Sequence, residues 1–176
     1  MCILVAFFNT IAGNGIVNIF STLIFDGITR MGGVSVLTTK QADYLVGFSG
    51  LVGAIVSFWS VPYFSRRTIF VGGHLIMGIL LFLLGYFIES RKQDLVIFFL
   101  CIFLITYQAT QGTAYWVYIP EICNSDSVMG ICLFTFMFFL TIQTMTAPFV
   151  MKTNLGIHGM FYVLAAINIC GFFLFG

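Results

Sequence analysis

Charge is what this sequence lacks most. Only 7% of its 176 residues are Asp, Glu, Lys or Arg, whereas 60% are hydrophobic. An ordinary soluble domain carries about a quarter charged residues. The composition therefore excludes a water-soluble fold and indicates a chain that lies in a lipid bilayer.

The few charges are grouped, and they leave six long stretches without any charge. A helix needs about 20 apolar residues to cross the hydrocarbon core of a bilayer, and each stretch is long enough to do so. The sequence therefore predicts an all-α integral membrane protein with six transmembrane helices. The predicted spans are 1–25, 44–65, 68–88, 95–120, 127–151 and 153–176.

The sequence also lacks the residue patterns of several functional classes. No carboxylate lies inside a predicted span, and the two histidines, His74 and His158, lie on different segments. The acid–base pair or nucleophile of an enzyme is therefore not indicated. The five cysteines show no metal-ligand spacing, and a net charge of +1 gives no basis for binding nucleic acid. We expect no enzymatic activity, no cofactor, no metal and no nucleic-acid partner.

The first two predicted spans are rich in glycine. Residues 9–15 combine two glycines with three polar side chains in the middle of the first span. Glycine eases the distortion of a helix, and opened backbone at membrane depth is tolerated only where protein or a water-filled cavity covers it. We therefore expect an irregular helix that lines a wet cavity. In the second span, Gly47, Gly50 and Gly53 predict close helix packing.

Neutral polar side chains also gather in the fourth and fifth predicted spans. Gln108, Gln111 and Tyr115 recur at helical spacing, which predicts one polar and aromatic face that continues to Trp116. Gln143 lies among threonines in the fifth span. Amides and an indole inside a membrane suit a polar, uncharged solute rich in hydroxyls, whereas an ion pump would usually carry a carboxylate there. His74, by contrast, is expected to hydrogen-bond a neighbouring helix rather than to relay protons.

Three segments resemble the sugar porter family of the major facilitator superfamily. Residues 116–122 (Trp-Val-Tyr-Ile-Pro-Glu-Ile) resemble the end of the family's tenth helix. Residues 62–68 resemble the turn between its eighth and ninth helices, and residues 13–25 are similar to its seventh helix. The segments stand in the family's order and at its spacing. The resemblance implies that the chain is the C-terminal six-helix half of a twelve-helix transporter, with an N-terminal six-helix half as its partner.

The resemblance also implies a binding site and a gate. Together with the polar face, it gives seven candidate substrate-binding residues: Asn9, Thr10, Asn14, Gln108, Gly112, Trp116 and Gln143. Trp116 stands where the family stacks a tryptophan on its sugar. The family's gating ion pairs fall on Arg66, Arg67 and Glu121, although Pro62 replaces an acidic residue and Ser65 a glycine of that pattern.

The function implied by this resemblance is transport of a hexose-like sugar by alternating access, as facilitated diffusion or proton symport. The solute would be a small neutral sugar or polyol, and we expect the plasma membrane rather than an internal one. One alternative is a non-transporting sensor or degenerate transporter paralogue, which the replaced gating residues favour. Another is a structural helix bundle whose polar residues serve only interhelical bonds. Orientation also stays open, because the side opposite Arg66 carries more Lys and Arg.

Overall fold

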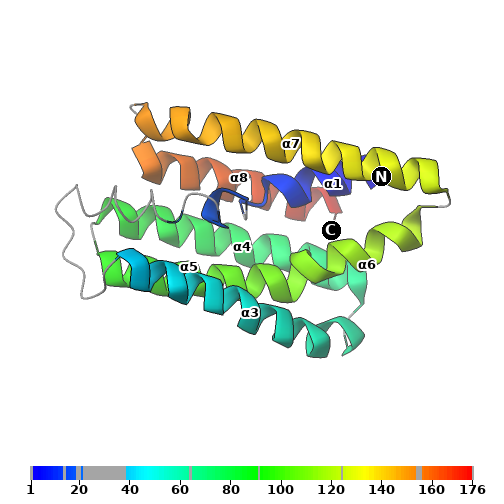
Figure 1. The fold of residues 1–176 in the computed structure, drawn as a ribbon, viewed down its shortest axis with the longest axis horizontal. Helices are drawn as coiled ribbons and strands as arrows, with labels where there is room; N and C mark the ends of the chain where they lie inside the picture. Colours follow the sequence, from blue (N-terminus) through cyan, green and yellow to red (C-terminus); the bar gives the residue numbers. More distant parts are fainter. Residues whose placement is uncertain are drawn as a thin grey trace.

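A computed structural model describes residues 2–13, 15–18, 21, 39–63, 65–90, 92–123, 125–153 and 156–175. Within these ranges all regular structure is helical (Figure 1). The helices are α1 (Cys2–Ile11), α3 (Thr39–Tyr63), α4 (Arg66–Glu89), α5 (Gln93–Tyr107), α6 (Thr113–Ile122), α7 (Asp126–Lys152) and α8 (Gly156–Phe175). A π-helical segment, η1 (Gln108–Gly112), joins α5 to α6.

The prediction of an all-helical membrane protein is confirmed. Among the described residues, five helical segments are long and apolar enough to cross a membrane: Lys40–Tyr63, Arg67–Glu89, Asp94–Glu121, Asp126–Met151 and Gly156–Phe175. They correspond to the second through sixth predicted spans. The first predicted span is described only in part, and its apolar run Ile3–Asn18 is shorter than the other five. The structure thus shows five spans, and a sixth stays a prediction.

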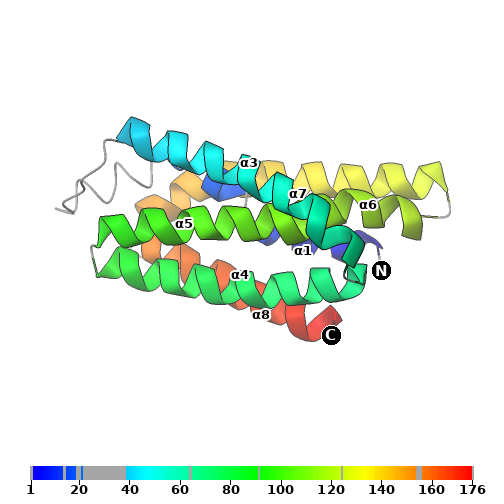
Figure 2. The ribbon, with the colours of Figure 1, turned by 90° about the horizontal axis from the view of Figure 1, so that it is seen from below.

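Successive long helices run antiparallel and form two groups (Figures 1 and 2). One group contains α3, α4 and the continuous α5–η1–α6 rod, and the other contains α1, α7 and α8. The two groups meet chiefly where α4 packs along α8. The α3–α4 and α6–α7 connections lie at one end of the bundle, together with the N and C termini.

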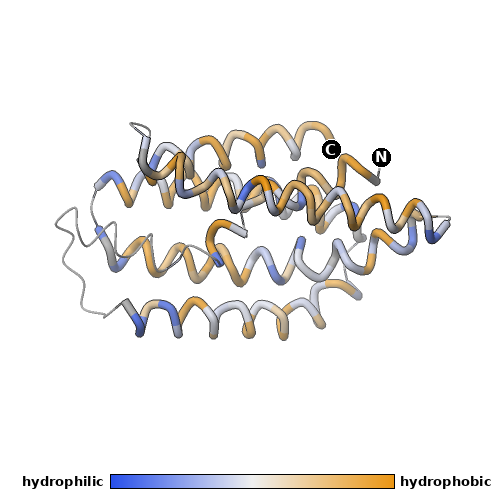
Figure 3. The backbone as a smooth tube through the Cα atoms, turned by 45° about the horizontal axis from the view of Figure 1, so that its top comes forward, coloured by the Kyte–Doolittle hydropathy of each residue, from blue (hydrophilic) through white to orange (hydrophobic). Residues whose placement is uncertain are grey.

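The middle of the bundle is apolar and closely packed. Buried Leu81 and Leu84 of α4 meet Phe103 of α5 and Phe161 of α8 in one continuous core. Figure 3 shows that hydrophilic positions gather near the ends of the helices, with a few inside the bundle. Large apolar side chains such as Phe58 of α3, 81% exposed, project outward. Such an apolar exterior suits a protein surrounded by lipid.

Close packing was predicted at three glycines of α3, and it occurs at one of them. A Cβ atom at Gly53 would lie 2.8 Å from the carbonyl oxygen of Ile105, so α3 and α5 approach each other closely there. In the described part of the chain, no atom lies within 4 Å of a Cβ placed at Gly47 or Gly50. The packing prediction was wrong for those two, because they face away from α5.

The connection expected at residues 62–68, from the resemblance to a turn between two helices, is shorter than that segment. α3 continues through Pro62 to Tyr63, and α4 begins at Arg66. The Ile69 N–H donates to the Ser65 carbonyl at 3.0 Å and closes the first turn of α4. The arginine segment is therefore the first turn of α4 rather than a loop.

The expected irregularity in the first predicted span is confirmed. α1 ends at Ile11, a turn follows at residues 12–13, and residues 15–18 are helical again. Gly13 has a φ of 101°, a conformation that residues with a Cβ rarely adopt. Beyond it, the Val17 N–H donates to the Gly13 carbonyl at 3.1 Å. We refer to residues 12–13 as the helix break.

A Gly13→Ala substitution tests the conformational demand of the helix break. A Cβ there would lie 3.4 Å from Leu164, an ordinary contact, so the penalty comes from the positive φ. We expect the free energy of unfolding to fall by about 1–3 kcal/mol, measured as a lower Tm of the whole protein in detergent. Gly50→Ala is the control, because alanine favours a helix, and it should leave the Tm unchanged or higher. Equal Tm values for Gly13→Ala and the unsubstituted protein would contradict this account.

Candidate functional site

Polar side chains from α1 and the helical residues after the break line a cavity of about 220 Å³ between α5 and α7. We call it the polar cavity. Its lining residues are Asn9, Thr10, Gly15, Asn18, Tyr107, Phe136 and Leu140. Two of them, Asn9 and Thr10, were predicted to bind substrate. The irregular first helix thus lines a cavity, as expected, whereas water in that cavity stays a prediction.

Asn9 and Thr10 are both buried, at 2% and 3% exposure. The Thr10 hydroxyl donates to the Ala6 carbonyl at 2.8 Å, so its oxygen keeps lone pairs to accept a further hydrogen bond. Within the described ranges, Asn9 Oδ1 has no hydrogen-bond partner. A buried acceptor left unpaired costs about 1–3 kcal/mol. Asn9 therefore carries an unpaired acceptor next to the polar cavity.

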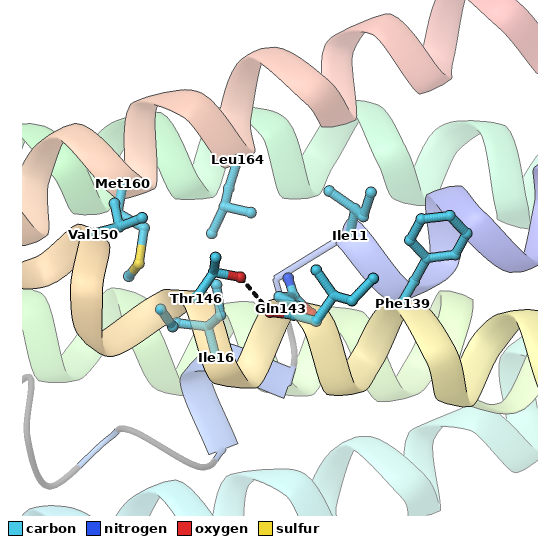
Figure 4. Close-up of a pocket in the computed structure, with 10 residues that line it drawn as sticks. Ile11, Ile16, Phe139, Gln143, Thr146, Val150, Met160 and Leu164 are labelled. Carbon is cyan, nitrogen blue, oxygen red and sulfur yellow. Dashed lines mark hydrogen bonds between the residues drawn. The ribbon is translucent and has the colours of Figure 1, made fainter.

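Gln143 of α7 lines a neighbouring cavity of about 210 Å³ whose other walls are mostly apolar. Figure 4 shows its amide between Ile11 and Ile16, with Phe139 alongside. Both amide atoms of Gln143 are buried, and neither has a partner among the residues that the structure covers. The nearby Thr146 hydroxyl, by contrast, donates to the Ile142 carbonyl of its own helix.

Gly15 lies where the two cavities adjoin. A Cβ atom at this position would lie 2.6 Å from Leu140 Cδ1 and 3.3 Å from Gln143 Oε1. Because Gly15 and Leu140 also line the polar cavity, the Gln143 amide lies close to that cavity. The structure thus brings Asn9, Thr10 and Gln143 into one region.

The π-helical segment changes the face predicted for the fourth span. Gln111 and Tyr115 are fully buried, whereas Gln108 is half-buried and Trp116 is 51% exposed. The prediction of one shared polar face was wrong, because a π turn inserts an extra residue and rotates the helix beyond it. The Gln111 amide and the Tyr115 hydroxyl have no partners in the part of the chain described.

Gln108 and Gly112 lie together beside α3. A Cβ atom at Gly112 would collide with Gln108 Oε1, so the side-chain amide of Gln108 packs directly against this glycine. Gln108 also packs against Gly53 of α3. Gln108 and Gly112 therefore contact each other rather than line the polar cavity. Gln108 directly follows Tyr107, which does line the cavity.

Trp116 contacts the polar cavity indirectly, because it packs against a ring that lines the cavity. Its indole packs edge-on against Tyr115 and against Phe136, with ring centroids 5.4 and 5.8 Å away. Phe136 in turn lines the polar cavity. Trp116 thus lies one ring away from the polar cavity, and about half of its surface is exposed.

The predicted gating residues lie at the end of the bundle that holds the α3–α4 and α6–α7 connections. Arg67 Nε and Nη2 donate to the Phe175 carbonyl at 3.4 and 3.2 Å, which ties the start of α4 to the end of α8. Glu121 lies exposed near the end of α6. The side chain of Arg66, and all of Asn14, lie outside the described residues.

Sequence reasoning missed five lining residues of the polar cavity: Gly15, Asn18, Tyr107, Phe136 and Leu140. Asn18 carried a signal, since Thr10, Asn14 and Asn18 recur every four residues as one face of a helix would. Tyr107 carried no signal in the sequence, because the π-helical segment that follows it determines where its side chain points. No group of three His, Cys, Asp or Glu side chains suited to a metal occurs in the described ranges.

Comparison with known proteins gives a consistent picture. A family model described as "Sugar (and other) transporter" matches residues 1–176. The curated protein "Sugar transport protein 10" of Arabidopsis thaliana is 23% identical over 134 residues, which cover 69% of this chain and 25% of that protein. The matched region thus spans about a quarter of the length of this relative. No solved structure matches the chain significantly.

A Gln111→Leu substitution tests whether this buried amide is structural. Because neither amide atom has a partner among the described residues, an apolar replacement removes an unpaired polar group and should stabilise the protein by about 1 kcal/mol. Tyr115→Phe removes another unpaired group and should leave the Tm equal or higher. Thermal unfolding in detergent measures both. A Tm several degrees lower in both variants would show that these groups have partners and refute the assignment.

Proposed function

Because the chain belongs to the sugar (and other) transporter family, we propose that it takes part in moving a hexose-like sugar across a membrane. Members of this family are transporters, not enzymes, and the apolar helices make this chain an integral membrane protein. The observation that carries the proposal is the polar cavity, in which the buried Asn9 Oδ1 has no partner within the described structure.

The polar cavity offers neutral hydrogen bonds on one side and apolar surface on the other. Asn9 and Thr10 accept hydrogen bonds from sugar hydroxyls. Phe136 and Leu140 pack against the C–H groups of the sugar ring. A site built to hydrogen-bond hydroxyls strongly rejects an analogue that lacks them, because its buried polar groups are then left unpaired. This chemistry favours a small neutral sugar or polyol over an ion.

The remaining predicted residues surround this cavity and belong to the proposed site. Gln143 reaches the solute from α7 across Gly15. Trp116 stacks on the solute at the border of the cavity, while Gln108 and Gly112 lie beside α3. Asn14, which falls in the same segment as the helix break, is proposed on its sequence position alone.

We propose alternating access as the mechanism, with this chain as the C-terminal six-helix half and an N-terminal six-helix half as its partner. The helix break lets the segment after α1 move relative to α1. Arg66, Arg67 and Glu121 form the gate at the end of the bundle where α4 begins. Facilitated diffusion and proton symport are the two modes proposed, and the plasma membrane is the proposed location.

A second candidate function is a non-transporting sugar sensor or a degenerate transporter paralogue. The observation that favours it is the replacement of two gating positions by Pro62 and Ser65. The two functions differ in one measurement on the whole protein in proteoliposomes. A transporter shows saturable sugar uptake, whereas a sensor binds sugar without flux. Uptake that accelerates under an inward proton gradient would assign proton symport.

An Asn9→Leu substitution tests the proposed site directly. Leucine keeps the approximate volume but removes the unpaired acceptor, so a sugar hydroxyl in the polar cavity would lose its partner. We expect the sugar Kd to rise about tenfold, measured by equilibrium binding to the purified whole protein. Thr135→Val is the control, since this exposed hydroxyl donates only to the Ile131 carbonyl of its own helix at 2.8 Å, and the Kd should not change. An unchanged Kd in Asn9→Leu would refute the site.

A further inference from the structure

A buried polar pair lies away from both cavities, between α4 and α8. His74 and Asn168 are 0% and 1% exposed, and His74 Nδ1 lies 3.1 Å from Asn168 Oδ1. The predicted hydrogen bond of His74 to a neighbouring helix is therefore confirmed. Polar pairs of this kind hold helices together in a bilayer, but this one also reaches a third segment.

The third segment is the helix break after α1. Asn168 Nδ2 donates to the Leu164 carbonyl of its own helix at 2.8 Å and to the Ala12 carbonyl at 3.3 Å. Because both partners are acceptors, the amide nitrogen must face them, which turns Asn168 Oδ1 toward His74. His74 Nδ1 must then carry the proton and donate it. The two carbonyls thus fix the orientation of the amide and the tautomer of the imidazole.

The Ala12 carbonyl stands where the helix of the first span is interrupted. Backbone groups released by a break at membrane depth require partners from neighbouring helices, because lipid supplies none. Beyond the break, the helical bond of Val17 returns to Gly13. The side chain of Asn168 supplies a donor to Ala12, one residue before Gly13 with its positive φ.

Aromatic rings fix the imidazole that orients Asn168. Phe70 packs edge-on against His74 with centroids 4.8 Å apart, and Phe175 stacks on it at 6.1 Å. Phe8 of α1 approaches the same ring edge-on at 6.1 Å. A Cβ at Gly171 would lie 2.9 Å from Phe8 and 3.3 Å from His74 Nδ1, so both rings pack closely against this glycine.

We propose that His74 and Asn168 are positioning residues for sugar binding, which hold the helix break so that the last turn of α1 presents Asn9 and Thr10 to the polar cavity. The inference rests on the proposed sugar-binding function. Asn9 follows Phe8 directly, and Thr10 lies two residues before Ala12, so the network contacts α1 on both sides of the two binding residues. His74 acts through Asn168, and Asn168 acts through the backbone of the break.

Substitutions at His74 separate a positioning role from a packing role. His74→Phe keeps an aromatic ring among Phe8, Phe70 and Phe175 but removes the donor to Asn168. His74→Asn keeps an N–H donor near the place of Nδ1 but removes the ring. We expect His74→Phe to raise the sugar Kd of the whole protein about fivefold, and His74→Asn to bind sugar more tightly than His74→Phe. A ring that served only for packing would give the reverse order and overturn the proposal.

Asn168→Leu removes the bond to the break itself. We expect it to raise the sugar Kd about tenfold or more and to speed hydrogen–deuterium exchange of the amides at residues 15–18. Adding His74→Phe to Asn168→Leu should raise the Kd no further, because His74 acts through Asn168. The matched control is Tyr162→Phe, which removes another α8-to-α4 hydrogen bond, from Tyr162 to Glu89 at 3.1 Å. It should change neither Kd nor exchange.

The exchange measurement separates this inference from the proposed function. If the unsubstituted protein binds no sugar, the proposed function fails, and exchange in Asn168→Leu then decides whether the pair holds the break. If Asn168→Leu does not fold, the sugar Kd and the hydrogen–deuterium exchange are both measured on His74→Phe. We expect faster exchange at residues 15–18 in that variant. If sugar binds and both Kd and exchange are unchanged in the folded variants, the positioning role is overturned.

Discussion

Lipid offers no hydrogen-bond partners in the hydrocarbon core of a bilayer, so each polar group inside a span must find a partner in the protein, in a water-filled cavity or in a solute. Most hydroxyls in the described spans meet this demand locally. Thr110, Thr135 and Thr141, for example, each donate to the carbonyl four residues earlier in the same helix, at 2.7 to 2.8 Å. Such residues need no function to explain their presence.

The same constraint distinguishes the side chains that remain. Asn168 satisfies its amide through three partners and ties together α4, α8 and the helix break. Asn9 Oδ1 and the Gln143 amide have no partners within the described ranges, and each belongs to a residue that lines a cavity. Asn168 ties helices together, whereas Asn9 and Gln143 differ from Gln111 and Tyr115, equally unpaired in the described part of the chain, in lining cavities, and we propose that a solute pairs with them. The account of sugar binding depends on this distinction.

Much of the fold could be predicted because charge delimits the spans. α4 (Arg66–Glu89) and α7 (Asp126–Lys152) begin and end close to the predicted limits, since charged residues stand at their ends, whereas α3 begins at Thr39 and includes Lys40 and Asp43. The break near Gly13 followed from glycine chemistry. The direction of Gln111 could not be predicted, because one π turn reorients the residues after it without any mark in the sequence. The exposure of Gly47 could not be predicted either. Tertiary packing decides which face of α3 meets α5.

The site was predicted in part for the same reasons. Asn9 and Thr10 were found because polar residues stand out in an apolar span, and the structure places both on one cavity wall. Tyr107 was not found, because the direction of its side chain depends on the π-helical segment that follows it. Trp116 was expected in the site, whereas it meets the cavity only through Phe136.

The central claim is that neutral hydrogen bonds in the polar cavity recognise a sugar. The most direct test is an experimental structure of the whole protein with bound D-glucose, at a resolution that places the hydroxyls. The account predicts the sugar in the polar cavity, with a hydroxyl within hydrogen-bond distance of Asn9 Oδ1 and ring carbons against Phe136. A sugar bound elsewhere, with the Asn9 acceptor still unpaired, would contradict it.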